Sequence, residues 1–469
     1  MTMKHIIPLL TGIQMMILLS ACALYGKYER PEEINTTGIV RDTSAASATT
    51  ADTLSVTDKS SFGNVPWQQV FTDPYLQGLI QQALTHNVDL RNAALNVEMI
   101  EKQLLVSKLA FVPGFSFTPN GALTQWNGGT WNKTYSLPVN ASWTVDLFGN
   151  LLSQKRSVQM KLLAMKDYQQ SVRCNIIAST ANLYYTLLML DKQLELVTEM
   201  NTLTKDTWDY MKLQKDLGRT KETSVVSAEA NYYSVMSQAA DLRRQIRETE
   251  NSLSVLLGMP AQAIQRGKIE DQVLPTQFSA GVGLALLDNR PDVHAAEMAL
   301  AQCFYDVETA RSNFFPNITI SGSAAFTNNS GAGIVNPGKW LLSAAGSLTQ
   351  PIFQHGMLVA NLKVAKIQYE QSLNTYQNAI YKAGSEVSNA LVLYNTSDEK
   401  SRLEQKQIDA LTKSVEYTKD LLAMGGASYI EVITSQQQLL NAELSKVADD
   451  FYKMQAIVNL YSALGGGKE

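Results

Sequence analysis

Charged residues are scarce in this chain, and so are cysteine and histidine. Asp, Glu, Lys and Arg make up 17% of the 469 residues, against roughly 25% in an ordinary soluble domain. With 39 basic and 43 acidic residues the formal net charge is -4, so the chain lacks the basic surface that a nucleic-acid partner requires. Three cysteines, one of them assigned to lipid attachment below, exclude a disulfide scaffold.

Sequence motifs of enzymes and metal sites are also missing. The four histidines are not spaced as metal ligands, and the sequence has no GxSxG nucleophile motif, no phosphate-binding glycine loop and no CxxC pair. We therefore expect no enzymatic activity, no metal, and no cofactor other than a covalently attached lipid.

The N-terminal residues 1–21 have the features of a lipoprotein signal peptide. An apolar run follows a basic start and ends in Leu-Ser-Ala-Cys at Cys22, and the run is too short to span a bilayer comfortably. The quartet resembles a bacterial lipobox, which predicts that Cys22 becomes the acylated mature N-terminus, although an ordinary signal peptide with an accidental cysteine is the alternative. Ala23, in place of aspartate, favours the outer membrane. Residues 22–62 are rich in Ser and Thr and are expected to form a solvated linker.

Proline and glycine are nearly missing from two long stretches, which predicts long helices. No proline occurs between Pro138 and Pro260, or after Pro351. Apolar residues in both stretches recur at steps of three and four, which is typical of coiled-coil packing. The longest uncharged segment of the first stretch is too short and too polar to cross a membrane. The expected helices are 151–217, 221–257, 357–424 and 428–464.

The two windows with the fewest charges alternate between apolar and polar residues instead. Residues 109–145 contain Lys133 as their only charge, and residues 312–362 contain only Lys339. Alternation over about ten residues per strand, with tryptophan near strand ends, is typical of a transmembrane barrel; a small soluble sheet with one buried face is the alternative. The expected hairpins are 114–146, with a tip near 127–129, and 317–350, with a tip at 329–338.

The alternation also assigns the two faces of the second strand in the first hairpin. Because a shift of one residue would exchange the two faces, this assignment is a sharp test of the barrel. Expected to face lipid are Leu137, Val139 and Trp143, and expected to face a water-filled lumen are Ser136, Asn140 and Ser142.

The chain is read as an internal duplication of two repeats, 63–274 and 275–469. Pro113 matches Pro316 just before each alternating segment, and further matches continue in order along both halves. Each repeat is expected to run as helix, β-hairpin, very long helix, glycine turn and return helix. Four strands cannot close a barrel, and open sheet edges are not tolerated in lipid, so several chains must share one barrel.

A series of motifs runs along nearly the whole chain, from Trp67 to Gly467. The motifs are Trp67, Phe71-Thr-Asp73-Pro74-Tyr-Leu76, Asp89-Leu90-Arg91, Asp146-Leu147-Phe148-Gly149, Asn289-Arg290-Pro291-Asp292-Val293 with Ala296-Glu297, Phe315-Pro316 and Gln350-Pro351-Ile352-Phe353. Together they resemble TolC-like outer-membrane efflux proteins, and the block around Arg290, Pro291 and Asp292, followed by Pro316, is the most specific part. The lipobox places the chain nearer the lipoprotein branch that serves resistance-nodulation-division pumps. Asn150 is a departure, because the family often has arginine there.

The resemblance implies a mainly α-helical homotrimer, in which a long coiled-coil tunnel continues into one transmembrane β-barrel with four strands from each chain. It implies a passive duct in the outer membrane of a Gram-negative bacterium, in contact with outer-membrane lipid, a periplasmic adaptor protein and an inner-membrane pump, and it leaves the exported substrate open. The alternative is a coiled-coil lipoprotein that acts as an envelope scaffold. That alternative explains the helices and Cys22 but not the hairpins without charge.

Glycines mark the end of the tunnel farthest from the barrel. Gly218 interrupts the first helical stretch, and Gly425 and Gly426 interrupt the second, because glycine accepts the left-handed conformation that ends a helix. The resemblance implies that acidic side chains just beyond the second turn narrow the tunnel. Glu431 occupies one such position, whereas Thr434 stands where the family often has aspartate.

We expect closure to depend on opposite charges of neighbouring hairpins. Arg219 or Lys221 in the first turn is expected to pair with Glu431 and to hold the tunnel shut. In the alternative, Glu431 forms a capping box with Ser428 and only satisfies amide groups of its own helix; the two roles are compatible. Further gate candidates are Glu222 and Ile430, the latter as an apolar plug.

Overall fold

The computed structural model describes residues 26–31, 62–125, 127–275, 290–329 and 334–468. Cys22, the signal peptide and most of the predicted linker lie outside the described residues. The chain divides into two units. The first comprises Met1–Ile34, Leu95–Asp167 and His294–Asn378, and the second comprises Asn35–Ala94, Tyr168–Val293 and Ala379–Glu469.

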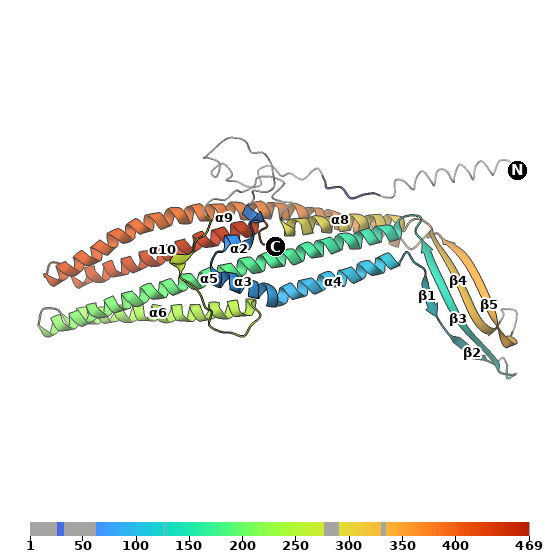
Figure 1. The fold of residues 1–469 in the computed structure, drawn as a ribbon, viewed down its shortest axis with the longest axis horizontal. Helices are drawn as coiled ribbons and strands as arrows, with labels where there is room; N and C mark the ends of the chain where they lie inside the picture. The colour runs from blue at the N-terminus through green and yellow to red at the C-terminus, as the bar shows by residue number, and fades with distance from the viewer. Residues whose placement is uncertain (1–25, 32–61, 126, 276–289, 330–333, 469) are drawn as a thin grey trace. The chain divides into compact units, whose positions relative to one another are not determined.

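The four longest helices form two helical hairpins (Figure 1). Two of them, α5 (Asn150–Asp216) and α9 (Met357–Ala423), have 67 residues each, which corresponds to about 100 Å at 1.5 Å per residue. Each is followed by a glycine turn and a return helix of 35 residues, α6 (Glu222–Leu256) after α5 and α10 (Tyr429–Ala463) after α9. All four agree with the predicted ranges to within one residue at either end.

Shorter helices precede each of these hairpins. Asp73 caps α3, because its side chain accepts a 2.8 Å hydrogen bond from the Tyr75 amide and Pro74 occupies the first helical position. Among the described helices, none has an apolar stretch long enough to cross a lipid bilayer. The shorter helices are η2 (Phe62–Asn64), α2 (Trp67–Val70), α3 (Pro74–His86), α4 (Val88–Leu109), η3 (Ile269–Asp271) and α8 (Pro291–Ser312).

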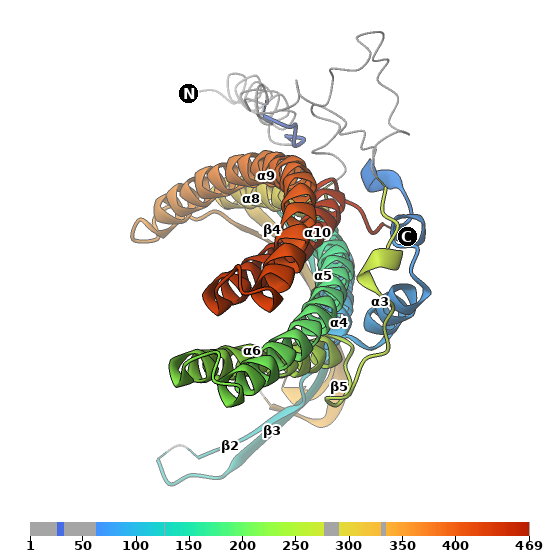
Figure 2. The same ribbon diagram turned by 90° about the vertical axis from the view of Figure 1, so that its left-hand side faces the viewer.

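The core of the second unit is an apolar cluster between α5, α10 and the short helices α2 and α3. Phe71 and Tyr461 meet edge to face with their ring centroids 5.9 Å apart, and Tyr184 and Leu460 are buried in the same cluster. A second cluster continues along the hairpins, where Val197 of α5 packs with residues of α6 and α10. Figure 2 shows α6 beside α5 and α10 beside α9. Heptad-like apolar spacing therefore packs these helices against one another, as the sequence predicts.

The strands of the first unit form one antiparallel sheet in the order β1-β3-β4-β5, with β2 also paired to β3. The predicted tip at 329–338 is too wide, because β4 extends to Asn329 and β5 already begins at Ile334. The strands are β1 (Gly114–Phe117), β2 (Asn120–Thr124), β3 (Asn132–Val145), β4 (Asn317–Asn329) and β5 (Ile334–Thr349).

The first predicted strand is interrupted, which the alternation did not reveal. β1 and β2 share one register on β3, with Phe117 opposite Val139 and Asn120 opposite Ser136. Between them the Thr118 amide donates to the Pro138 carbonyl at 3.3 Å, but Pro138 has no N–H with which to return the bond. β1 and β2 therefore occupy one strand position, and the sheet has four positions, as predicted.

Candidate functional site

The register of the sheet gathers the apolar residues on one face. Opposite Val139 of β3 lie Phe117 of β1 and Ala324 of β4, and Trp143 lies opposite Ile320. Most of the side chains on this face are exposed; Val139, for example, is 48% exposed. Further apolar members of the face are Phe115, Leu137, Phe326, Trp340, Leu342 and Leu348.

The other face of the sheet is polar and uncharged along most of its length. Asn140 lies between Ser116 and Ser323, and Ser323 lies in turn opposite Ser343 with their hydroxyl oxygens 2.7 Å apart. Asn140 also donates to the Thr118 hydroxyl at 3.0 Å. One face thus suits hydrocarbon and the other suits water, which is the pattern of a strand in a transmembrane barrel.

Aromatic side chains lie near both ends of the strands. Near the hairpin tips, Phe326 contacts Tyr135 and Trp340, with ring centroids 6.2 and 5.8 Å apart. At the helical end, the indole N–H of Trp143 donates to the Phe111 carbonyl at 3.0 Å. Such aromatic bands are typical of the two membrane interfaces of a barrel.

Two of the sequence motifs meet where the sheet joins the helices of the first unit. Phe148 stacks on Phe315 with ring centroids 5.1 Å apart and an interplanar angle of 17°. Asp146 accepts a 2.8 Å hydrogen bond from the Leu152 amide near the start of α5. Asn150, where the family often has arginine, donates to the Ser312 hydroxyl at 2.7 Å and so ties α5 to the end of α8.

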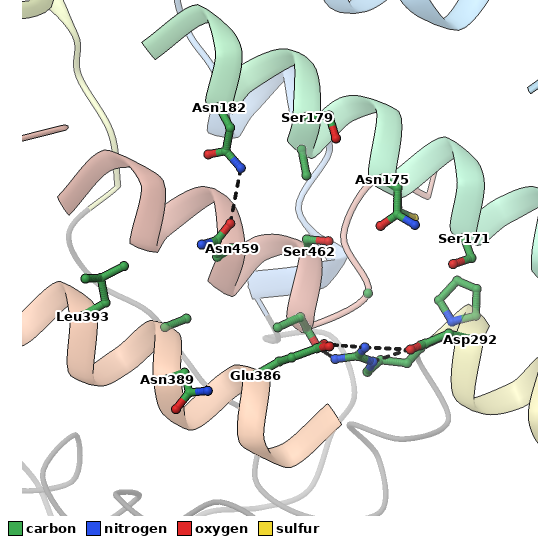
Figure 3. Close-up of a pocket in the computed structure, with 17 residues that line it drawn as sticks. Ser171, Asn175, Ser179, Asn182, Asp292, Glu386, Asn389, Leu393, Asn459 and Ser462 are labelled. Carbon is green, nitrogen blue, oxygen red and sulfur yellow. Dashed lines mark hydrogen bonds and ion pairs between the residues drawn. The ribbon is translucent and has the colours of Figure 1, made fainter. Parts of the chain in front are cut away.

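Arg290 links the start of α8 to α9 and α10, and two of its partners, Asp292 and Glu386, are labelled in Figure 3. Its guanidinium makes two bonds to the Asp292 carboxylate, at 3.0 and 2.7 Å, an ion pair of 2.7 Å with Glu386 of α9, and a 3.0 Å hydrogen bond to the Ala463 carbonyl at the end of α10. The group lines a cavity of about 670 Å³ whose other polar residues include Asn182. The Arg-Pro-Asp motif therefore fastens the start of α8 to α9 and α10.

The charges of this group hold each other in the ionised state. Burial raises the pKa of Asp292, but the hydrogen bond and charge of Arg290 outweigh burial and keep that pKa below its ordinary value. Burial likewise lowers the pKa of Arg290, and the bonds and charges of Asp292 and Glu386 outweigh it and raise the pKa. Both groups therefore remain charged at neutral pH.

The glycine turns at the two hairpin tips have the predicted conformation. Gly218 and Gly425 have φ values of 71° and 78°. In the first turn the Arg219 amide donates to the Gln214 carbonyl at 2.8 Å, and in the second the Gly426 amide donates to the Leu421 carbonyl at 2.7 Å. These bonds, from the third residue beyond the end of each helix to a carbonyl of its last turn, form Schellman motifs.

The capping box predicted at the start of α10 is present. The Glu431 amide donates to the Ser428 hydroxyl at 3.4 Å, and the Glu431 carboxylate accepts from the Ser428 amide at 3.2 Å. Within one chain, as far as it is described, Glu431 forms no ion pair with Arg219 or Lys221. A pairing between hairpins of different copies stays a prediction.

The other gate candidates lie on exposed surfaces of the two tips. Glu222 forms an ion pair with Lys215 of its own hairpin, so its charge is already partly compensated. Arg219, Ile430 and Thr434 are exposed in the single chain.

One carboxyl pair between α9 and α10 was not found by sequence reasoning. Glu404 Oε2 and Asp449 Oδ2 are buried oxygens that no donor reaches within the described residues, and Lys400 Nζ lies 2.7 Å from the other oxygen of Asp449. Burial, then the Asp449 carboxylate, which can accept a hydrogen bond from Glu404 only when Glu404 is protonated and whose negative charge acts in the same direction, together with the charge of Asp450, raise the pKa of Glu404 to about 7. Protonated Glu404 can donate to Asp449, whereas ionised Glu404 repels it. No sequence motif signals this pair, because its two members belong to different helices.

The pair predicts a pH dependence of stability. The pKa of Glu404 is about 7 in the folded chain, against an ordinary value of 4.5 for a glutamate in the unfolded chain. Its contribution to stability is therefore present below pH 4.5 and is lost as the pH rises through about 7. Glu404→Gln should therefore narrow the difference between the melting temperatures measured at about pH 5 and pH 8. Glu399→Gln, at an exposed site of the same helix, is the matched control. Equal pH dependence in Glu404→Gln and the parent protein would contradict the prediction.

Comparisons with known proteins match this architecture over most of the chain. The family model described as "Outer membrane efflux protein" matches residues 79–259 and 284–466. The probable outer membrane lipoprotein SilC of Salmonella typhimurium is 26% identical over 87% of this chain and 89% of its own length. The toluene efflux pump outer membrane protein TtgC of Pseudomonas putida is 28% identical over 86% of this chain and 85% of its own length.

A solved structure has the same fold. The open state of the Neisseria gonorrhoeae MtrE outer membrane channel superposes with a TM-score of 0.79 at 25% identity, covering 94% of this chain and 98% of MtrE. The predicted fold class, long helices combined with a sheet of a membrane channel, is thereby confirmed.

Proposed function

The chain belongs to the outer membrane efflux protein family, and we propose that three copies of it form one closed β-barrel and a helical tunnel through which cargo leaves the cell. It is an outer-membrane component of an efflux system in a Gram-negative bacterium. Its family consists of efflux channels and not of enzymes. Energy and choice of cargo then come from a periplasmic adaptor and an inner-membrane pump of the resistance-nodulation-division type, while this chain supplies the passive duct.

The observation that carries this proposal is the sheet of the first unit. It has an apolar face, a polar face and two unpaired edges, one on the β1 and β2 position and one on β5. Open edges are not tolerated in hydrocarbon, and even the smallest single-chain barrels need about eight strands. Pairing of β5 with the β1 and β2 edge of the next copy removes both edges from every copy.

Oligomeric state and conductance together test the proposal. The purified full-length protein should run as a heat-resistant trimer band and should form ion channels in planar lipid bilayers. A scaffold lipoprotein without transport would bind membranes but conduct no ions. A monomer without conductance would therefore contradict the proposal.

Lipid attachment at Cys22 is part of the proposed function. Leu19-Ser20-Ala21-Cys22 motivates it, and the name of the relative SilC describes a lipoprotein. Labelling of cells with a fatty acid such as palmitate should mark the parent protein and should not mark Cys22→Ser. Because one acylated residue is only a supplementary anchor beside a barrel, Cys22→Ser should still insert into the outer membrane. Label that persists in Cys22→Ser would contradict the assignment.

We further propose that the hairpin tips form the gate. In a trimer, Arg219 or Lys221 of one hairpin pairs with Glu431 of a neighbouring hairpin. An exposed ion pair stabilises the closed tip by only about 0 to 1 kcal/mol, but a trimer contains three such pairs. A weak interaction suits a latch that an adaptor must release. The capping box leaves this role open, since a carboxylate has two oxygens and several acceptor positions.

Charge reversal tests the gate. Arg219→Glu or Glu431→Lys should raise the resting conductance and sensitise cells to large antibiotics, because like charges then face each other across the tip. The double reversal should restore closure. If both single variants conduct like the parent, Glu431 is a helix cap only, and Ile430 becomes the candidate plug.

A further inference from the structure

The sheet carries only two charged side chains per chain. Residues 109–145 contain Lys133 and residues 312–362 contain Lys339, and neither window contains any Asp or Glu. Within the described residues neither lysine has a carboxylate partner. Any fixed charge in the wall of the barrel must therefore be positive.

The register places the two lysines on opposite faces. Lys339 lies opposite Thr327, on the polar face that carries Ser323 and Ser343. Lys133 lies opposite Leu123, and because it is two residues from Tyr135 on β3 it shares the apolar face with Tyr135. In a closed barrel Lys339 lines the lumen, whereas Lys133 lies on the outer surface.

Both lysines lie toward the hairpin tips. Lys339 precedes the last residue of β5, Thr349, by ten residues, which is about 34 Å along a strand and a rise of about 26 Å for a strand tilted by about 40°. The apolar band of a barrel is about 25 Å tall. Since the strands join the helices at their other ends, Lys339 lies at the outer mouth of the lumen.

We propose that Lys339 makes the outer mouth of the channel selective for anions over cations. This inference rests on the proposed trimeric barrel, in which each copy contributes one Lys339 to a ring. Rings of lysine or arginine attract anions into a pore and repel cations, and here the polar face offers no acidic residue to cancel the charge. Neutral and anionic solutes leave through this mouth more readily than cationic solutes of the same size.

Ion selectivity of the reconstituted full-length protein tests this inference. Lys339→Gln, Lys339→Glu and the parent are compared in planar bilayers across a KCl gradient between about 0.1 M and 0.01 M, where the Debye length is about 10 to 30 Å. We expect the chloride-to-potassium permeability ratio to fall by about threefold or more in Lys339→Glu, with Lys339→Gln intermediate. At about 1 M KCl the Debye length is about 3 Å and the difference should nearly vanish.

Lys133→Glu is the matched control, since it makes the same charge change on the opposite face of the sheet. Its permeability ratio should equal that of the parent. An unchanged ratio in Lys339→Glu, or an equal shift in Lys133→Glu, would overturn the inference while leaving the channel itself established. If the parent forms no channels, the proposed function fails first, and the inference fails with it.

Discussion

Val139→Arg is expected to destabilise the membrane-inserted barrel by about 2 to 4 kcal/mol per copy, because it places a charge on the face that meets lipid. Val139 lies on the exposed apolar face, opposite Ala324. It precedes the last residue of β3, Val145, by six residues, which places it near the middle of the hydrocarbon layer at about 3.4 Å per residue. Since each trimer carries three copies, we expect loss of the heat-resistant trimer and of protein in the outer-membrane fraction.

Asn140→Arg is the matched control for this substitution. Asn140 is the next residue along β3, on the polar face between Ser116 and Ser323. Arginine there meets water, so the trimer should form and only its conductance should change. Equal loss of trimer in both variants would contradict the assignment of the faces.

Cysteine labelling tests the same assignment without introducing a charge. A membrane-impermeant thiol reagent should modify cysteines placed on the polar face and should spare those on the apolar face. Equal labelling at positions 139 and 140 would contradict the assignment of these strands to a transmembrane barrel. The polar set is Ser136, Asn140 and Ser142, and the apolar set is Leu137, Val139 and Trp143.

Arg290→Met is expected to lower the free energy of unfolding by about 3 kcal/mol. Removing one partner from a buried ion pair leaves the other charge uncompensated, at a cost of about 3 to 5 kcal/mol. The lower end applies because Asp292 and Glu386 keep some access to water, with side chains 43% and 54% exposed. The Ala463 carbonyl also loses its bond, so the end of α10 should loosen from α8.

Thermal unfolding of the full-length protein, followed by helical circular dichroism, measures the effect of Arg290→Met. The control is Arg243→Met, which removes an arginine at an exposed site of α6. Arg290→Lys should fall between the two, because lysine keeps the charge but cannot make the two parallel bonds to Asp292. If Arg290→Met melts like Arg243→Met, the network has no stabilising role.

The sequence predicts the long helices and the two faces of the sheet because both depend on local spacing. Missing proline and the glycines at Gly218 and Gly425 bound the helices, and strict alternation around Val139 assigns the strand faces. Interactions between distant segments follow no such rule. The bond from Arg290 to Ala463 and the carboxyl pair of Glu404 and Asp449 form only after separate helices pack together.

The interruption between β1 and β2 could not be predicted from the alternation of polar and apolar residues. Pro138 does not disturb the alternation of polar and apolar residues in β3, so the alternation alone predicts an uninterrupted strand beside it. The lost bond depends on which backbone groups of β3 point toward β1 and β2, and that follows from the register. The resemblance points to Glu431 as a gate residue. Within one chain Glu431 lies in a capping box, and its pairing with a basic residue of another copy stays a prediction.

The interrupted strand has a consequence for the chain before it assembles. Thr118 directs its backbone toward β3, so the next residue, Pro119, directs its backbone toward the free edge of the sheet. That edge therefore lacks one N–H group, and proline on an edge is a recognised obstacle to adventitious strand addition. During transit through the periplasm, a lone subunit with this gap is a poorer template for aggregation than one with an unbroken edge.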